Sequence, residues 1–195
     1  MKRIFDMLSS FMVLVLLAPF FLVIALLIKL DSPGKVFFKQ IRVGKDGKHF
    51  SLLKFRTMRP DSDRLSQITV GDRDPRVTHV GYYLRKYKLD EIPQLFNIIG
   101  GDMSVVGPRP EVPKYVQLYN AEQRIVLSIR PGLTDYASLQ YVNESEILAK
   151  AADPEKAYVN EIMPHKLELN KKYIREKSFF TDLKIILQTL LRIIR

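Results

Sequence analysis

The sequence predicts a mainly α-helical protein of the α+β class, with a small β-hairpin, one domain and an N-terminal helix in the membrane. Three observations lead to this class. Residues 11–28 carry no charge or strongly polar group, two extended runs flank an Asp-Gly turn at 44–47, and helical patterns fill most of the chain after residue 78. No repeat or long linker interrupts the rest, so we place a membrane anchor at 1–30 and one domain at 31–195.

The apolar run at 11–28 is long enough for a membrane. As a helix it would measure about 27 Å at ~1.5 Å per residue, close to the ~30 Å hydrocarbon thickness. A soluble helix in so small a protein is rarely apolar on every side, which favours insertion. A cleaved signal peptide is the competing interpretation, but the run exceeds an ordinary signal core and no small-x-small cleavage site follows it.

Positive charges on both sides of this run predict its topology. Lys2 and Arg3 precede it, and six lysines and arginines follow between residues 29 and 48, so both flanks should be cytoplasmic. Pro19, near the middle, bends a helix, and two arms of roughly 13 Å would each cross about one leaflet. We therefore expect a re-entrant helix broken at Pro19. The alternative is a kinked single-pass helix with its N-terminus outside, and both alternatives leave the domain in the cytoplasm.

The first extended runs form the predicted hairpin, with strands at 36–43 and 50–58. Lys54 and Arg56 are two residues apart and therefore share one strand face, where two cations could hold a phosphate. A solvated strand face near acidic lipid is the alternative, and this feature alone favours that alternative.

The remaining elements are predicted helices. The last one places apolar residues on one face and Lys184, Gln188, Arg192 and Arg195 on the other, so it either packs on the core or lies on anionic lipid. The neighbouring membrane segment favours lipid. The helices are expected at 79–87, from about 90 to a stop at Gly100-Gly101, at 113–127, 144–152, 154–177 and 179–194.

Composition restricts the classes of function. The chain has 31 Lys and Arg against 21 Asp and Glu, a net charge of +10, which suggests an anionic partner. The excess lies in two blocks, at 29–59 and 166–195, and no recognisable nucleic-acid motif or aromatic-basic platform accompanies it, so we expect no nucleic-acid partner. The chain has no cysteine, which excludes disulfides, thiolate metal sites and a thiol nucleophile.

Two adjacent carboxylates, Asp90 and Glu91, stand at an expected helix start that Pro93 supports. Adjacent carboxylates bind hard divalent cations, and Mg²⁺ typically uses one or two carboxylates plus substrate phosphates. An ionised carboxylate can also act as a nucleophile toward phosphorus. The alternative is ordinary helix capping, which these two residues alone would favour.

Basic residues flank this pair in the sequence. Arg85 lies shortly before it, and Arg109 follows between two prolines that restrict its backbone. A guanidinium held in a fixed orientation suits a phosphate or diphosphate. A rigid turn with an exposed arginine is the alternative. The segment Arg130–Thr134 is a third basic turn and a weaker indication.

These motifs resemble a known family, the bacterial sugar transferases, also called monotopic phosphoglycosyl transferases, in their minimal catalytic form. The resemblance extends over nearly the whole chain and includes the proline-containing membrane segment. It is carried by Lys54–Met58, Asp74–Thr78, Leu84–Lys86, Leu89–Asn97, Gly101–Pro110, Arg130–Thr134, Ser178-Phe179 and Asp182–Ile185.

The resemblance implies an enzyme on the cytoplasmic face of a bacterial inner membrane. It would transfer a sugar 1-phosphate from a UDP-sugar to polyprenol (undecaprenyl) phosphate, release UMP, and so start exopolysaccharide, lipopolysaccharide, capsule or other glycoconjugate synthesis. Asp90 would form a covalent phosphosugar intermediate, and Asp90 and Glu91 would hold Mg²⁺. A homodimer is left open. Substrate phosphates would be bound by Arg85, Arg109, Lys54, Arg56, Arg76 and Arg130.

The chain departs from the family pattern in two places. Many members have Gly-Trp where this chain has Asp135-Tyr136, so recognition of sugar or nucleotide by this loop is not implied. A Ser-Pro pair often breaks the membrane helix, whereas Ala18 precedes Pro19 here. The alternative function is a non-catalytic, membrane-anchored adaptor that binds lipid phosphate, which explains the anchor and the basic blocks but not Asp90-Glu91 with Arg109.

Overall fold

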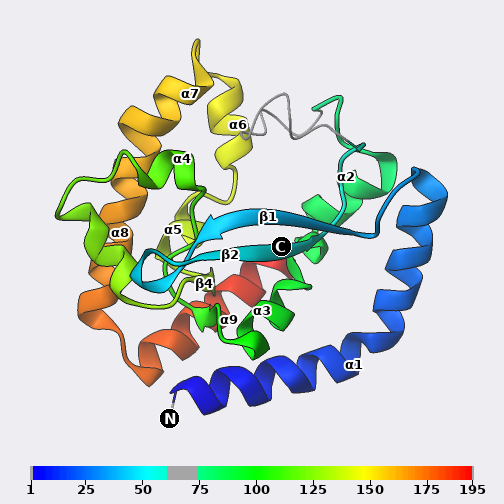
Figure 1. Cartoon of the computed structure of the whole chain (residues 1–195), viewed down its shortest axis with the longest axis horizontal. Coiled ribbons are helices and arrows are strands. Elements are labelled where there is room, and N and C mark those ends of the chain that lie inside the picture. The colour runs from blue at the N-terminus through cyan, green and yellow to red at the C-terminus, as the bar shows by residue number, and fades with distance from the viewer. Residues whose placement is uncertain (1, 61–73, 195) are drawn as a thin grey trace.

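The computed structural model describes residues 2–60 and 74–194, and most of them are helical (Figure 1). The antiparallel hairpin of β1 (Phe37–Val43) and β2 (His49–Phe55) lies across the molecule. The predicted α+β class with a small hairpin is therefore confirmed. A second, parallel pair, β3 (Ser104–Val106) and β4 (Gly132–Thr134), was not predicted, because strands of three residues are too short to show periodicity.

The N-terminal helix α1 (Lys2–Asp31) is long and apolar enough to cross a membrane. It bends strongly near its middle and follows two sides of the molecule (Figure 1). The expected break at Pro19 is wrong, because helical structure continues across the proline. The expected bend is confirmed by the course of the helix in Figure 1. A proline removes one N–H and displaces the preceding turn, which bends a helix without necessarily ending it. Large apolar side chains such as Leu16 and Leu22 face outward.

Polar residues in the first turns of α1 bind the domain. Arg3 donates to the carbonyl oxygen of Ile98 at 2.6 Å, and the buried Asp6 accepts from Ser104 Oγ at 2.6 Å. The inner face of α1 thus packs on the domain while its outer face stays apolar. The division into an anchor at 1–30 and a domain at 31–195 stays a prediction.

The C-terminal end of α1 is held by Arg56, which is buried just after β2. Its guanidinium donates to the carbonyl oxygens of Ser32, Pro33 and Lys35 at 2.7–2.8 Å, and to Ser32 Oγ at 2.8 Å. Helix C-termini leave carbonyl groups without intrahelical partners, and this arginine satisfies carbonyls at and just beyond the end of α1.

The hairpin turn agrees with the sequence. Asp46 and Gly47 adopt left-handed backbone angles, with φ of 56° and 75°, within the 3₁₀ turn Lys45–Gly47. Asp and Gly tolerate this region better than other residues, which is why an Asp-Gly pair predicts a turn. The register pairs Phe37 with Phe55 and Val43 with His49.

The segment that carries the two adjacent carboxylates differs from its prediction. Helix α2 (His79–Lys86) and helix α3 (Gln94–Gly100) are separated by a 3₁₀ turn at Leu89–Glu91. Asp90 and Glu91 therefore lie on a turn of their own and not at the start of α3. The reason is Lys88, whose left-handed φ of 55° ends the preceding helix and redirects the chain.

Most of the other predicted helices are confirmed, and one is wrong. In place of a helix at 113–127, a short α4 (Pro113–Val116) and a 3₁₀ segment (Gln123–Ser128) stand apart. Asn120 accepts from the backbone N–H of Gln123 at 2.9 Å, and this local bond competes with a continuous helix. The helices predicted at 144–152 and 154–177 are found as α6 (Glu144–Ala149) and as a continuous run of α7 (Pro154–Ala157), a π segment (Tyr158–Ile162) and α8 (Met163–Glu176). A further short helix, α5 (Tyr136–Gln140), was not predicted.

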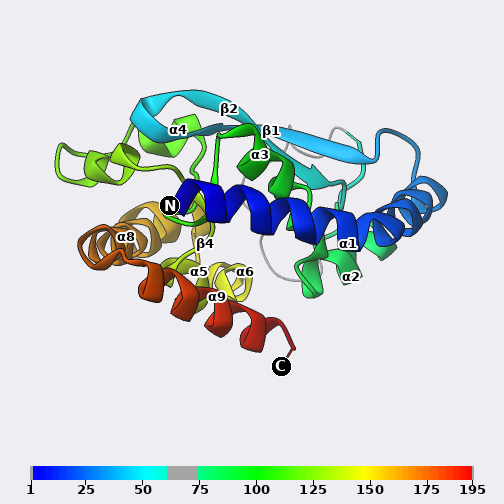
Figure 2. The same cartoon turned by 90° about the horizontal axis from the view of Figure 1, so that it is seen from below.

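The last helix, α9 (Phe179–Ile194), has an inner and an outer face. Ile185 is fully buried against the domain, whereas Phe180 is 80% and Leu191 64% exposed. Helices α1 and α9 begin side by side and then diverge (Figure 2), and the ring centroids of Phe5 and Phe179 are 5.6 Å apart. The inner face of this helix therefore packs on the core, as one of the two alternatives predicted. The outer face is apolar and exposed, and its contact with lipid stays a prediction.

Two glycines, one in α2 and one in α3, give a matched test of how closely α2 packs on the segment that follows β2. A Cβ at Gly81 in α2 would lie 2.1 Å from the carbonyl oxygen of Thr57, whereas a Cβ at Gly100 in α3 would meet nothing within 4 Å. We expect Gly81→Ala to lower the free energy of unfolding by about 2 kcal/mol or more. Gly100→Ala should raise it by about 0.5–1 kcal/mol. Thermal unfolding of the detergent-solubilised variants checks this, and equal melting temperatures would contradict it.

Candidate active site

Three separate parts of the fold bring the predicted site residues together. Asp90 and Glu91 lie on the 3₁₀ turn between α2 and α3, Lys54 is near the end of β2, and Arg109 is in the loop after β3. Lys54 and Arg109 are 55 residues apart in the sequence, yet both contact Glu91. The site therefore depends on the packing of the hairpin, the turn and the loop.

Glu91 is clamped between two cations. Lys54 Nζ donates to Glu91 Oε1 at 2.9 Å, and Arg109 donates to Oε2 at 3.1 Å and also to Oε1. Burial alone would raise the pKa of Glu91, but the charges and hydrogen bonds of Arg109 and Lys54 hold that pKa well below its usual range. Glu91 is therefore an ionised, fully occupied carboxylate that fixes two cations in place.

Asp90 has the opposite environment. It is only 6% exposed, and its nearest cation is Lys54, whose Nζ lies 3.9 Å from Oδ2. Among residues 2–60 and 74–194, no group donates a hydrogen bond to its carboxylate. Burial raises the pKa of Asp90, and the charge of Lys54 opposes this only in part. The carboxylate of Asp90 therefore has little exposure to water and accepts no hydrogen bond from the described residues.

Arg85 completes the charge around Asp90. Its Nε donates to Thr57 Oγ1 at 2.8 Å, and its charge is one of those that favour the ionised form of Asp90. Burial lowers the pKa of Arg85, while the carboxylate of Asp90 opposes this shift. A guanidinium that is partly removed from water beside a carboxylate is well suited to bind a phosphate. Thr57, which orients it, was not predicted from the sequence.

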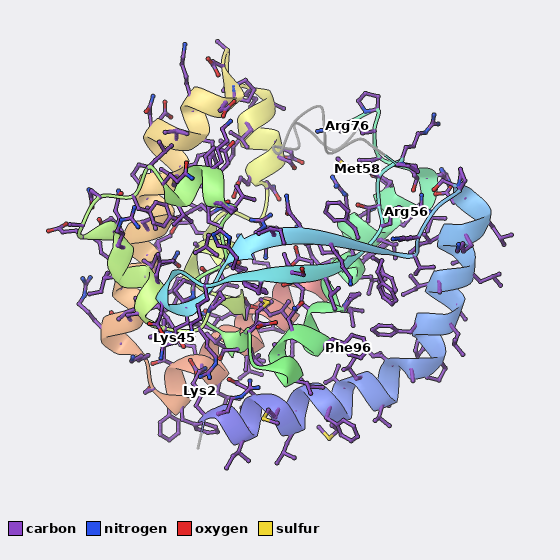
Figure 3. The ribbon with its side chains drawn as sticks, in the orientation of Figure 1. Lys2, Lys45, Arg56, Met58, Arg76 and Phe96 are labelled. Carbon is purple, nitrogen blue, oxygen red and sulfur yellow. The ribbon has the colours of Figure 1, made fainter. Side chains whose placement is uncertain are left out.

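The other predicted phosphate-binding residues have different partners. Arg56 holds the end of α1, as described above, and Arg76 pairs with Asp74, with Nη2 to Oδ2 at 2.6 Å. Figure 3 shows Arg56 near the end of α1 and Arg76 above the hairpin. Arg130 is exposed and donates to the carbonyl oxygen of Gly101 at 2.9 Å. None of these contacts reaches Asp90 or Glu91, so phosphate binding by these three residues stays a prediction.

The carboxylates available for a metal ion are few. Among the described residues, no group of three His, Asp or Glu side chains could hold a metal ion by itself. Both oxygens of Glu91 accept from cations, whereas those of Asp90 accept from none of the described residues. The donor set therefore fits Mg²⁺ through Asp90, provided that a substrate supplies further oxygens.

A residue that sequence reasoning did not place in the site lies behind Arg109. Asp135 is fully buried, and its Oδ2 accepts from the backbone N–H of Arg109 at 3.2 Å. The prolines on both sides of Arg109 have no N–H, so the sequence indicates that the backbone N–H of Arg109 needs a hydrogen-bond partner. The sequence does not indicate which residue supplies that partner, because the contact joins two loops that are distant along the chain.

The contrast between the two carboxylates predicts opposite changes in stability. The raised pKa of Asp90 means that its ionisation lowers stability as the pH rises through that pKa, so Asp90→Asn should raise the melting temperature at neutral pH. Glu91→Gln removes the counter-charge of two partly buried cations and should cost about 2 kcal/mol. Thermal unfolding at pH 7 and at pH 4 measures both variants. A lower melting temperature for Asp90→Asn at pH 7 would contradict the unfavourable burial of its charge.

The chain is similar to known proteins over its whole length. A family model described as bacterial sugar transferase matches residues 1–195. The exopolysaccharide production protein ExoY of Rhizobium meliloti is 36% identical over 97% of this chain and 83% of its own length. The UDP-N-acetylgalactosamine-undecaprenyl-phosphate N-acetylgalactosaminephosphotransferase of Aeromonas hydrophila is 36% identical over 97% of this chain. The UDP-glucose:undecaprenyl-phosphate glucose-1-phosphate transferase of Escherichia coli is 35% identical over 98% of this chain. The chain spans 42% and 40% of the length of these last two relatives. The resemblance in its motifs is thereby confirmed, and the chain belongs to the bacterial sugar transferase family.

Proposed function

We propose that this protein transfers a sugar 1-phosphate from a UDP-sugar to a polyprenol phosphate such as undecaprenyl phosphate and releases UMP. The observation that carries the proposal is the buried carboxylate of Asp90, which accepts no hydrogen bond from the described residues and lies beside Lys54 and Arg85. The names of two relatives state transfer to undecaprenyl phosphate and a UDP-sugar donor. The product would start the assembly of an exopolysaccharide or another glycoconjugate.

The reaction would proceed in two displacements at one phosphorus atom. A carboxylate oxygen of Asp90 attacks the β-phosphorus of the UDP-sugar, the bond from this phosphorus to the bridging oxygen breaks, and UMP leaves with that oxygen. The sugar phosphate is then held as an acyl phosphate on Asp90. A phosphate oxygen of the polyprenol phosphate attacks the same phosphorus, which forms the lipid diphosphate and restores the carboxylate.

Cations make this attack of one anion on another feasible. Arg85 and Arg109 are positioned to bind the diphosphate oxygens, and their charge stabilises the transition state. Lys54 and Arg109 are already held in place by Glu91, so little reorganisation is needed when the donor binds. Glu91 acts in this proposal by orienting these two cations.

Mg²⁺ is the metal that this donor set fits. Asp90 and the diphosphate of the donor would supply its oxygen ligands, and Glu91 would join them only by giving up a contact with Lys54 or Arg109. When bound, Mg²⁺ would neutralise charge on the diphosphate.

The site would lie at the level of the lipid headgroups, where the acceptor phosphate is found. The apolar outer faces of α1 and α9 support this placement, since both helices begin side by side and expose large apolar side chains. We propose that α1 enters one leaflet and returns at its bend, with both ends on the cytoplasmic side, and that the outer face of α9 lies in the interface.

Turnover tests the proposed reaction. Purified protein, Mg²⁺, undecaprenyl phosphate and a panel of UDP-sugars should release UMP. Asp90→Asn should lower the rate by about 10³-fold or more, because a carboxamide is a far weaker nucleophile. Asp46→Asn, at the exposed tip of the hairpin, is the matched control and should turn over normally.

With acceptor omitted, mass spectrometry should find a phosphosugar on Asp90, and label on another residue would remove Asp90 as the nucleophile. Release of UMP by none of the UDP-sugars would favour a lipid-phosphate adaptor.

Tryptophan fluorescence tests the placement in the membrane, because the chain has no tryptophan of its own. A single Trp is introduced at Leu187, on the exposed apolar face of α9, and at Phe11 on α1 as a positive control. In vesicles with brominated lipids, the tryptophan fluorescence of both variants should be quenched. The fluorescence of a Trp at the polar position Gln188 should not be quenched. Quenching of Phe11→Trp alone would show that α9 stays out of the interface.

A further inference from the structure

The loop that carries Arg109 has an unusual backbone. In Pro108-Arg109-Pro110 the two prolines have no N–H, so Arg109 supplies the only backbone donor of this tripeptide. The segment before it is fixed by its pairing with β4: Gly107 donates to Thr134 at 3.1 Å. A Cβ at Gly107 would lie 2.6 Å from the carbonyl oxygen of Arg130, so the two loops are in close contact.

The single N–H of Arg109 is met by a buried carboxylate. Asp135 directly follows β4 and is 0% exposed. Its Oδ2 accepts from Arg109 N at 3.2 Å, while its Oδ1 accepts from Ser138 N at 2.6 Å and caps α5. One side chain thus ties the Arg109 loop to the N-terminus of a helix that packs on α8 and α9.

The same carboxylate also acts on Arg109 through its charge. The pKa of Arg109 is raised above its usual value, mainly by Glu91, and Asp135 adds to this effect. The guanidinium of Arg109 is hydrogen-bonded to Glu91, and its backbone N–H is held by a second acid, Asp135.

We propose that Asp135 is a positioning residue for the transfer reaction: its carboxylate fixes the backbone of Arg109, so that the guanidinium stays on Glu91 and faces the donor diphosphate. The inference rests on the proposed function, in which Arg109 binds the donor. It assigns a role to Asp135, the first residue of the pair at which the chain departs from the pattern it resembles. Asp135 itself is enclosed and contacts no substrate.

Asp135→Ser separates this role from helix capping. Serine caps helices about as well as aspartate, so α5 should keep its cap, but its shorter side chain and single oxygen cannot also reach Arg109. We expect kcat to fall about 10- to 100-fold, since a small displacement of a catalytic group has effects of this size. Asp153→Ser is the matched control, because Asp153 caps α7 through Lys156 N at 3.0 Å and is exposed, and it should leave kcat unchanged.

A double-mutant cycle distinguishes positioning from general destabilisation. In an Arg109→Ala background, Asp135→Ser should lower kcat no further, because the guanidinium to be positioned is gone, whereas its effect on the melting temperature should persist. Additive losses in kcat, or a normal kcat in folded Asp135→Ser protein, would overturn the proposal.

Amide exchange tests the contact without any turnover. The Arg109 amide should be protected in the wild-type protein and should exchange at least 10-fold faster in Asp135→Ser, as measured by NMR. A rapidly exchanging Arg109 amide in the wild type would overturn the proposal even if the variant did not fold. If the Arg109 amide is protected but the protein releases no UMP, the proposed function is contradicted while the contact between Asp135 and Arg109 is established.

Discussion

The clamp of Lys54 and Arg109 on Glu91 is the interaction on which the site depends. It joins the hairpin, the turn between α2 and α3, and the loop after β3, three segments that are separate along the chain. Two cations that are partly removed from water need a counter-charge, and the single carboxylate of Glu91 supplies it for both. Glu91 therefore gathers positive charge at the place where the proposed reaction would bind an anionic donor.

Adjacent carboxylates have different chemistry here because their surroundings differ. Asp90 and Glu91 are neighbours on one short turn, yet burial dominates for Asp90 and ion pairing dominates for Glu91. A carboxylate that lacks donors is costly to ionise and correspondingly reactive, whereas a paired one is stable and inert. The roles proposed for them, nucleophile for Asp90 and organiser for Glu91, rest on this difference in surroundings.

Helix α1 serves the fold as well as the proposed anchoring. Its outer face is apolar, but Arg3 and Asp6 bind the end of α3 and the start of β3, and Arg56 holds its C-terminal end. Strand β3 leads directly into the loop of Arg109. The anchor and the site are therefore connected by short, hydrogen-bonded elements, so the depth of α1 in a membrane would also set the height of the site above it.

Several elements could be predicted from the sequence because their signals are local. The apolar run of α1, the Asp-Gly turn at Asp46-Gly47, the amphipathic α9 and the family motifs around Asp90 and Arg109 could all be read from it, because composition, spacing and turn chemistry act over a few residues. The packing of the folded chain was needed to show that Arg56 holds a helix end while nearby Lys54 enters the site. It was also needed to show that Asp135 accepts from the Arg109 backbone. These outcomes depend on which loops and strands pack together, and no local pattern in the chain encodes the partner of a buried charge or a single unpaired N–H.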